Sequence, residues 1–408
     1  MTQTNKISNP ASGLAILFTA QVLERIAYYG IRSILVLFLI KEAADGGGGL
    51  SREEAFHLYG VFTVAVYLMS IGGGLLSDLV LSRLKVATLG VLVFAAGSTM
   101  FALSPSSSVL LSLLVMSAGI GLFKPTATSL LAIQFYDRPE KLDGVFTTHI
   151  LLVNVSAFIA ALSIPFIAET YSFSLGFYIA TVLLIAACTV LYFGKDKVNC
   201  TSFLEIPENV PVTRGIKFLC LFMLLSTLYW FSYESMYPFL SELKQYSNTN
   251  SLNMQMVGTA TTMSVGVLCC IMWFAIRINS WLKLCIGLLL YTLFWLFIGY
   301  ANSGQTLIGL ATLLISAEII FAISELFFTP ILMSLVARYG PKRFISTSFA
   351  LFAFAGVVSN YVVGSYGEQN ESSIPYFVAI FGFAAIAILI YMIIASKKEP
   401  SDIEVANT

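Results

Sequence analysis

Long apolar runs, separated by short polar stretches, recur along nearly the whole chain of 408 residues. Each run is long enough for an α-helix, at 1.5 Å per residue, to cross about 30 Å of hydrocarbon. The runs are too long for strands and lack the alternation of a lipid-facing barrel. The pattern therefore predicts an all-α membrane protein with 12 transmembrane helices, over residues 13–40, 56–77, 85–104, 108–134, 143–168, 174–194, 216–241, 254–276, 281–301, 306–337, 344–366 and 374–395.

The longest polar interval between these runs, residues 195–217, divides them six and six. We expect an N-terminal six-helix bundle over residues 1–194, a cytoplasmic linker over 195–217, and a C-terminal six-helix bundle with a short cytoplasmic tail over 218–408. This layout resembles the major facilitator fold, whose two halves rock around a site near the middle of the bilayer.

Composition and charge agree with a membrane protein. Hydrophobic residues make up 58% of the chain and charged residues 11%, against roughly 25% charged in a typical soluble domain. With the N-terminus inside, sixteen Lys and Arg fall in cytoplasmic segments and three in outward loops. The positive-inside rule then predicts a multi-pass protein of the plasma (inner) membrane with both termini cytoplasmic. We expect the first run to be retained as a helix and not cleaved as a signal peptide.

Other classes of function have no support in the sequence. The six cysteines show no disulfide framework and no metal-ligand spacing. No nucleotide-binding loop and no nucleophile with a suitably spaced base is present. We therefore expect no enzyme activity, no cofactor, no metal and no nucleic-acid partner, and we expect a monomer in the lipid bilayer.

A polar segment at residues 73–85 reads GGLLSDLVLSRLK. Gly74, Asp78 and Arg83 resemble the loop motif of the major facilitator superfamily. The glycines would let helices approach closely, and the aspartate could brace a neighbouring helix end. The alternative is an ordinary polar turn.

Seven ionisable residues lie inside the predicted spans. Each costs about 2.5–3.5 kcal/mol on insertion scales, so such residues normally face the bundle interior and pair. They are Glu24, Arg25, Arg32, Lys124, Glu234, Glu318 and Glu325.

The first helix carries a polar stripe. Gln21, Arg25, Tyr28 or Tyr29, and Arg32 follow steps of three and four residues and so share one face. Glu24 lies beside this face, where it could pair with neighbours of Arg25 or brace the fourth helix. The stripe suits one wall of a polar substrate cavity, and structural ion pairs between helices are the alternative.

Three further helices carry charge. Lys124 stands directly before Pro125 in the fourth helix, where it offers a point charge for a carboxylate or phosphate. In the seventh helix Trp230 and Glu234 are four residues apart and share a face, which equally fits core packing with one structural acid.

The tenth predicted helix holds Glu325, with Glu318 seven residues earlier on nearly the same face. Glu318 alone we interpret as structural. The membrane cations thus lie in the first half of the chain, and most of the membrane acids lie in the second half. This separation fits a zwitterion, with the carboxylate at the cations and the ammonium at Glu325.

The first half resembles the proton-coupled oligopeptide transporter (POT/PTR) family of the major facilitator superfamily. Residues 21–32, QVLERIAYYGIR, resemble the family pattern E-x-x-E-R-F-x-Y-Y-G followed by x-R. Residues 73–78 resemble its G-G-x-x-x-D form, and residues 124–125 its K-P pair. Asn154 stands where the family has the asparagine of I-N-x-G-S.

The second half carries the resemblance further. Trp230 and Glu234 match the tryptophan and acid of the family's seventh helix. Asn253 lies in a segment similar to S-x-N-P, with the proline missing. Residues 325–330, ELFFTP, match E-L-x-x-S-P.

The resemblance implies roles for these residues in binding a small peptide and in coupling to protons. The carboxylate end of the peptide would be bound by Arg25, Tyr29, Arg32 and Lys124, with Tyr67 as a companion. The backbone and amino end would be bound by Asn154, Asn253 and Glu325, with Trp230 lining a side-chain pocket. Glu234 would exchange partners with Arg32 or Lys124 during gating, and proton coupling or gating would involve Glu24, Glu234 and Glu325.

The chain departs from the family pattern at three points. Gln21 replaces the first glutamate of the helix-1 pattern, and an amide does not titrate. The two extra helices that many bacterial members insert between the halves are absent. The aromatic-rich stretch of the fifth helix has become TTHILLVN, which leaves His149 in a span as either a proton acceptor or a packed side chain.

The leading hypothesis is a secondary transporter that imports di- and tripeptides by alternating access, with proton symport. One alternative is a transporter of the same fold for a modified peptide, nitrate or a drug-like amphiphile. The alternative from another class is a non-transporting membrane sensor or scaffold.

Overall fold

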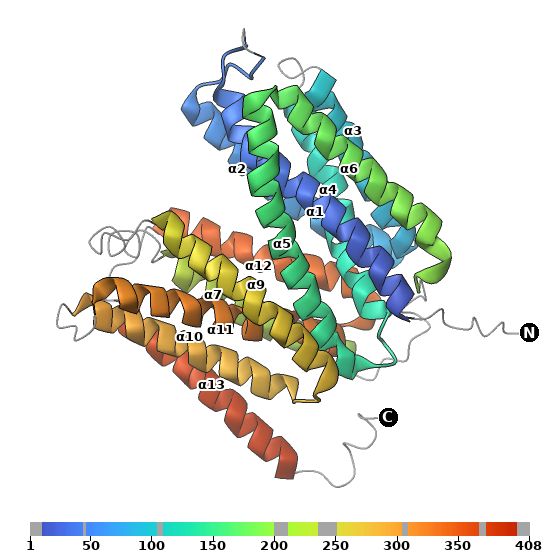
Figure 1. The fold of residues 1–408 in the computed structure, drawn as a ribbon. Coiled ribbons are helices and arrows are strands. Elements are labelled where there is room, and N and C mark those ends of the chain that lie inside the picture. Colours follow the sequence, from blue (N-terminus) through green and yellow to red (C-terminus); the bar gives the residue numbers. More distant parts are fainter. Residues whose placement is uncertain are drawn as a thin grey trace, which may run out of the picture. The chain divides into compact units, whose positions relative to one another are not determined.

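The computed structural model describes residues 10–43, 46–103, 109–199, 211–235, 251–303, 309–366 and 373–397, without the side chains of residues 251–255, 360, 362, 364–366 and 393–397. These residues form twelve long α-helices and no strand, which confirms the predicted all-α class. The helices, coloured in chain order in Figure 1, are α1 (Pro10–Ile40), α2 (Arg52–Leu79), α3 (Arg83–Leu103), α4 (Val109–Ile133), α5 (Leu142–Thr170), α6 (Phe173–Gly194), α7 (Val212–Ser235), α9 (Ser251–Ala275), α10 (Ser280–Asn302), α11 (Leu310–Tyr339), α12 (Ile345–Tyr366) and α13 (Ile374–Lys397).

Each predicted run overlaps one of these helices, with ends that differ by a few residues; residues 104, 108, 236–241 and 306–308 of the predicted runs lie outside the described residues. By length and composition, ten segments of the described chain are long and apolar enough to cross a membrane. The helices not among these ten are α1 and α12. Glu24, Arg25 and Arg32 lie within nine residues of α1, and these three ionised residues lower the mean hydropathy of the helix.

The chain forms two compact units. Unit 1 comprises Met1–Pro139, Leu152–Glu208 and Gly340–Phe354; unit 2 comprises Glu140–Leu151, Asn209–Tyr339 and Ala355–Thr408. Residues 140–151 at the start of α5 thus pack with unit 2, and residues 340–354 around the start of α12 pack with unit 1. The predicted division into halves at residues 195–217 stays a prediction about domains.

Unit 1 is built on close contacts of α4 with α3 and α2, and of α6 with α1 and α3. Glycines allow the approach of α3 to α4. A Cβ atom on Gly119 would lie 2.2 Å from the backbone nitrogen of Phe94, and one on Gly90 would lie 2.8 Å from the carbonyl oxygen of Gly119. Small residues let membrane helices pack backbone to backbone in this way. Since Lys124 is carried on α4, this packing fixes its place in the unit.

Unit 2 packs α10 against α11 and α13, and α11 against α9 and α7. Aromatic rings fill the space between α7, α10 and α11. The ring of Tyr229 stacks on Tyr291 at 4.0 Å and on Phe328 at 4.2 Å between centroids. The hydroxyl of Tyr291 donates to the carbonyl oxygen of Tyr229 at 3.0 Å, and the hydroxyls of Tyr229 and Ser324 lie 3.2 Å apart. These contacts fix α7 and α11, and so the positions of the residues that follow Tyr229 and Ser324 in the chain, Trp230 and Glu325.

Candidate functional site

The polar stripe on α1 is organised around one tyrosine ring. The guanidinium carbon of Arg25 lies 4.8 Å from the centroid of Tyr28, and that of Arg32 lies 5.6 Å from it. Both arginines therefore share one face of α1, as the spacing predicted. Tyr28 occupies the place between them, and half-buried Tyr29 lies edge-on to it with 5.2 Å between ring centroids.

Glu24 and Arg25 form a buried ion pair. The guanidinium donates from Nε to Oε2 at 2.5 Å and from Nη2 to Oε1 at 2.6 Å, and the two residues are 0% and 6% exposed. Glu24 thus pairs with Arg25 itself and not with the neighbours of Arg25. It also interacts electrostatically with Lys124 of α4, so its bracing of the fourth helix stays a prediction. Adjacent residues do not face each other on a helix, but both side chains are long enough to turn together. The pair neutralises both charges, as buried charges require.

Arg32 has aromatic hydroxyls as its partners. Its guanidinium donates from Nε to the hydroxyl oxygen of Tyr59 at 2.8 Å, and from Nη1 to that of Tyr28 at 3.5 Å. In the part of the chain that the structure describes, no carboxylate lies within ion-pair distance of Arg32. Sequence reasoning missed Tyr59, although its spacing of eight residues from Tyr67 on α2 was a usable signal.

Lys124 lies half-buried on α4, next to the internal Pro125. Its Nζ atom is 4.6 Å from the ring centroid of Tyr67, which was predicted as a companion of the carboxylate-binding residues. This is cation–π distance. Among the described residues no carboxylate lies within ion-pair distance of Lys124, although the charge of Glu24 acts on it from farther away.

Two other polar residues lie in unit 1. Gln21 on α1 is buried, and it brings no charge to the cluster. Asn154 lies half-buried on α5, in the part of this helix that belongs to unit 1. Its role in binding stays a prediction.

The predicted loop motif lies at the end of α2, with Arg83 as the first residue of α3, and it braces the start of α12 within unit 1. The carboxylate of Asp78 accepts from the backbone nitrogens of Ser346 and Thr347 at 3.3 and 2.8 Å, and from Arg83 at 2.7 Å. A carboxylate at the first turn satisfies orphan N–H groups and complements the helix dipole. A Cβ atom on Gly74 would lie 2.8 Å from the Cα of Thr347, so the motif has the bracing geometry expected of it.

The acids of unit 2 lie on α7 and α11. Trp230 and Glu234 are both half-buried on α7. Glu325 is half-buried on α11 and interacts electrostatically with Glu318, in keeping with their spacing of seven residues. Within the described part of unit 2, no Lys or Arg lies within ion-pair distance of Glu325. The side chain of Asn253, in the first turn of α9, lies outside the described residues.

Sequence reasoning missed a buried charge cluster in unit 2. Asp143, which is 1% exposed at the start of α5, accepts from Lys283 at 2.6 Å, Arg338 at 2.8 Å, Ser334 at 2.6 Å and Ser280 at 2.8 Å. Lys283 is itself 1% exposed, and its Nζ atom lies 4.1 Å from the ring centroid of Trp273. The only signal in the sequence was an acid at the edge of a predicted span, which is also where solvent-exposed acids occur.

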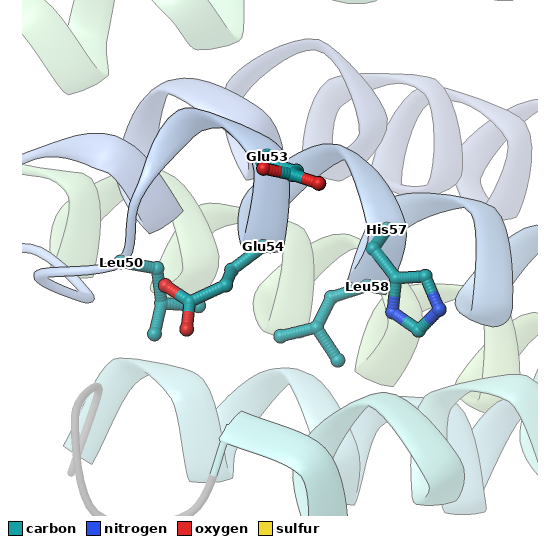
Figure 2. A pocket seen from close by; sticks show the side chains of 5 residues that line it. All are labelled: Leu50, Glu53, Glu54, His57 and Leu58. Atoms are coloured by element: carbon teal, nitrogen blue, oxygen red, sulfur yellow. The ribbon is translucent and has the colours of Figure 1, made fainter.

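A hollow of about 470 Å³ lies beside the N-terminal end of α2. Figure 2 shows the side chains that line it: Leu50, Glu53, Glu54, His57 and Leu58. The carboxylate of Glu54 accepts from the backbone nitrogen of Ser51 at 2.9 Å as part of a capping box, so it serves the helix end. No group of three metal-ligating side chains occurs in the searched, described residues, and the hollow holds none of the predicted site residues.

The described residues form twelve long helices, ten segments of which are long and apolar enough to cross a membrane, and these define a multi-pass membrane protein. A sequence profile described as the POT family matches residues 79–307, which is more than half of the chain. The chain belongs to the POT family. This confirms the resemblance that the motifs predicted.

Bacterial peptide permeases are among the chain's relatives. The dipeptide and tripeptide permease A of Proteus mirabilis is 33% identical over 188 residues, which cover 45% of this chain and 38% of the permease. The permease A of Escherichia coli K12 is 31% identical over 199 residues, covering 48% of this chain and 38% of the relative. The chain thus matches less than half the length of these relatives.

Solved structures share the fold along nearly the whole chain. One described as peptide transporter POT in complex with sulfate has a TM-score of 0.55 at 20% identity and covers 94% of both chains. A POT family transporter in complex with 5-aminolevulinic acid has a TM-score of 0.58 at 18% identity, over 95% of this chain and 96% of that one. The human organic anion transporter MFSD10 has a TM-score of 0.67 at 17% identity, over 93% and 99%. These likenesses confirm the predicted major facilitator fold.

Proposed function

We propose that this protein is a secondary transporter that imports di- and tripeptides by alternating access, coupled to protons. Membership of the POT family and relatives named as dipeptide and tripeptide permeases support the proposal. The strongest support comes from the surroundings of two membrane cations. Arg32 and Lys124 are half-buried cations in membrane helices, and in the described chain their contacts are tyrosines and not carboxylates. Three cations of α1 and α4 face one carboxylate, Glu24. Positive charge that is kept from water and not fully compensated is costly, so an arriving carboxylate is favoured.

Each end of a peptide has a matching group in this proposal. Arg32 and Lys124, with Tyr29 and Tyr67, bind the terminal carboxylate, while Arg25 is held by Glu24 until a ligand or gating step releases it. The ammonium binds Glu325. By resemblance, the peptide backbone is assigned to Asn154 and Asn253, and the side chain to Trp230.

Proton coupling requires a titrating group, and Gln21 cannot supply one. Glu24 is engaged by two hydrogen bonds from Arg25, whereas Glu325 has no cationic partner among the described residues. We therefore assign the exchanged proton to Glu325 and a gating role to Glu234. We also place the protein in the plasma (inner) membrane, with both termini cytoplasmic.

A transporter for another substrate is the second candidate. The observation that favours it is the excess of cations over carboxylates in the α1 and α4 cluster, which suits a simple anion such as nitrate. One structural neighbour is described as an organic anion transporter and another binds 5-aminolevulinic acid, a modified amino acid. A simple anion would make no use of Glu325.

Two substitutions separate these candidates. For a peptide transporter we predict that Lys124→Ala and Glu325→Gln each weaken binding of alanyl-alanine about tenfold or more, because each removes a charge partner of one end of the zwitterion. Binding is measured as ligand-induced thermal stabilisation of the purified full chain.

Matched control variants are Lys195→Ala and Glu169→Gln, because both residues are exposed at the ends of unit 1 helices. They should leave binding unchanged. Should Glu325→Gln bind as well as the native chain while Lys124→Ala does not bind, an anion would be the better substrate.

A further inference from the structure

One end of unit 2 has a cluster of aromatic rings that come from four helices. Trp281 lies half-buried in the first turn of α10, and its ring centroid is 5.9 Å from that of Phe222 and 6.4 Å from that of Phe218, both on α7. It is also 5.8 Å from the ring of Tyr339, the last residue of α11, and 5.5 Å from that of Tyr391 on α13. All four helices contain segments long and apolar enough to cross a membrane. Because α7 and α10 begin at the cluster and α11 and α13 end near it, the cluster lies where these helices reach the bilayer surface.

This cluster differs from the aromatic core of the same unit in its exposure. Tyr229 and Tyr291 in the core are 0% exposed, whereas Tyr391 in the cluster is 46% exposed. Trp281 and Tyr339 are half-buried. Tryptophan and tyrosine combine an apolar ring with a polar tip, and both are enriched at the boundary between hydrocarbon and water. The open side of the cluster therefore faces the level of the lipid headgroups.

Two basic residues of α7 lie beside the cluster. The guanidinium carbon of Arg214 is 5.8 Å from the ring centroid of Phe218, which is cation–π distance. Lys217 directly precedes Phe218, and both basic residues are exposed. In the part of the chain that the structure describes, neither has a carboxylate within ion-pair distance.

The described acids at this end of unit 2 already have partners. Glu140 lies 3.7 Å from Arg277, and Asp143 is enclosed by the two cations and two hydroxyls described above. The other acids in the described part of unit 2 lie in the last turn of α7 and well inside α11. The positive charge on the first two turns of α7 is therefore available to a partner from outside the described chain.

We propose that this surface binds an anionic phospholipid, with the headgroup phosphate at Arg214 and Lys217 and the glycerol and acyl chains against the rings around Trp281. Basic residues where a membrane helix meets the bilayer surface attract anionic lipids, and basic pockets between such helices bind their headgroups. The planar fork of Arg214 matches phosphate oxygens, and its place over Phe218 brings this charge next to the rings. The inference goes beyond the proposed transport and is independent of the substrate.

The test uses the fluorescence of Trp281. Purified full chain in detergent micelles is titrated with phosphatidylglycerol or phosphatidylcholine that has bromine on its acyl chains, which quenches tryptophan on contact. We expect phosphatidylglycerol to bind about tenfold or more tightly, because its net negative charge is attracted by two basic residues. In Trp281→Phe the preferential quenching should disappear, since Trp273 and Trp295 are 3% and 0% exposed.

Charge variants make the test specific. The double variant Arg214→Gln, Lys217→Gln should lower the preference to about twofold or less, and each single variant should lower it about threefold if the double variant does not fold. The matched control is Arg277→Gln, an exposed arginine at the same end of unit 2 that already lies 3.7 Å from Glu140. It should keep the preference. Inorganic phosphate at the same concentration should not displace the lipid, because it has no apolar part to pack on the rings.

Four results would overturn the inference. The first is equal binding of the two lipids by the native chain. The second is a preference that survives the loss of both Arg214 and Lys217. The third is a preference that Arg277→Gln removes equally, because the charge of the whole surface would then select the lipid. The fourth is displacement by inorganic phosphate, which would indicate a site for a free ion. None of these results bears on peptide transport, which uptake measurements test separately.

Discussion

Replacement of Arg32 by alanine is expected to lower dipeptide uptake by about thirtyfold or more. Truncating one partner of a desolvated charge pair costs about 2 kcal/mol or more, and 1.4 kcal/mol corresponds to a factor of ten. The variant also frees the hydroxyl of Tyr59, which now accepts from Arg32 at 2.8 Å. The measurement is the initial rate of labelled alanyl-alanine uptake into proteoliposomes, with the amount of folded protein checked by its thermal unfolding.

The control for this prediction is Arg52→Ala. Arg52 is exposed in the first turn of α2 and lies over the ring of Phe56 at 5.7 Å, so it is an arginine of the same unit with an aromatic neighbour but outside the charged stripe. Its loss should change uptake by about twofold or less. An Arg32→Ala protein that unfolds normally and transports at the native rate would remove Arg32 from the site.

Replacement of Asp143 by alanine should have the largest effect on stability. The carboxylate of Asp143 accepts hydrogen bonds from four side chains, and its removal leaves the ammonium of buried Lys283 without its counter-charge. Breaking a buried pair from one side costs about 3–5 kcal/mol. We predict a loss of this size in the free energy of unfolding, measured by denaturant titration in detergent.

Asp137→Ala is the matched charge deletion. Asp137 lies six residues earlier, with its side chain 36% exposed and 3.9 Å from Arg138. A surface pair of this kind contributes about 0–1 kcal/mol. If the two variants lose equal stability, the cluster around Asp143 does not hold unit 2 together as described.

The fold could be predicted because the bilayer fixes the length of a helix that crosses it. Within the described residues each predicted run overlaps a helix, and even the first, with three ionised residues, is one continuous helix over Pro10–Ile40. The unit to which the first residues of α5 belong could not be predicted. Residues 140–151 pack with unit 2, and this assignment depends on contacts with distant parts of the chain, which a hydrophobic pattern does not specify.

The site could be predicted where one helix carries the information. Steps of three and four residues brought Arg25 and Arg32 to one face of α1, and both lie over Tyr28. Contacts between helices that are distant in the chain could not be predicted from the sequence. Arg32 and Tyr59 are separated by 27 residues, and Asp143 and Arg338 by 195. Such pairs depend on helix packing, which a hydrophobic pattern does not specify.

The ionised residues of the membrane helices differ in their surroundings between the two units. In the described residues, Arg32 of α1 and Lys124 of α4 contact tyrosines, and Glu325 of α11 has an acid as its electrostatic neighbour. Both arrangements favour a ligand of opposite charge. A zwitterionic peptide has both charges.

The central claim is proton-driven peptide import, and uptake by reconstituted protein tests it most directly. Purified full chain is placed in proteoliposomes, and entry of labelled alanyl-alanine is followed with and without an inward proton gradient. The account predicts saturable uptake that unlabelled dipeptide inhibits and that the gradient accelerates. Uptake that does not respond to the gradient would contradict the assignment of proton coupling to Glu325, and uptake no greater than that of empty liposomes would contradict peptide transport itself.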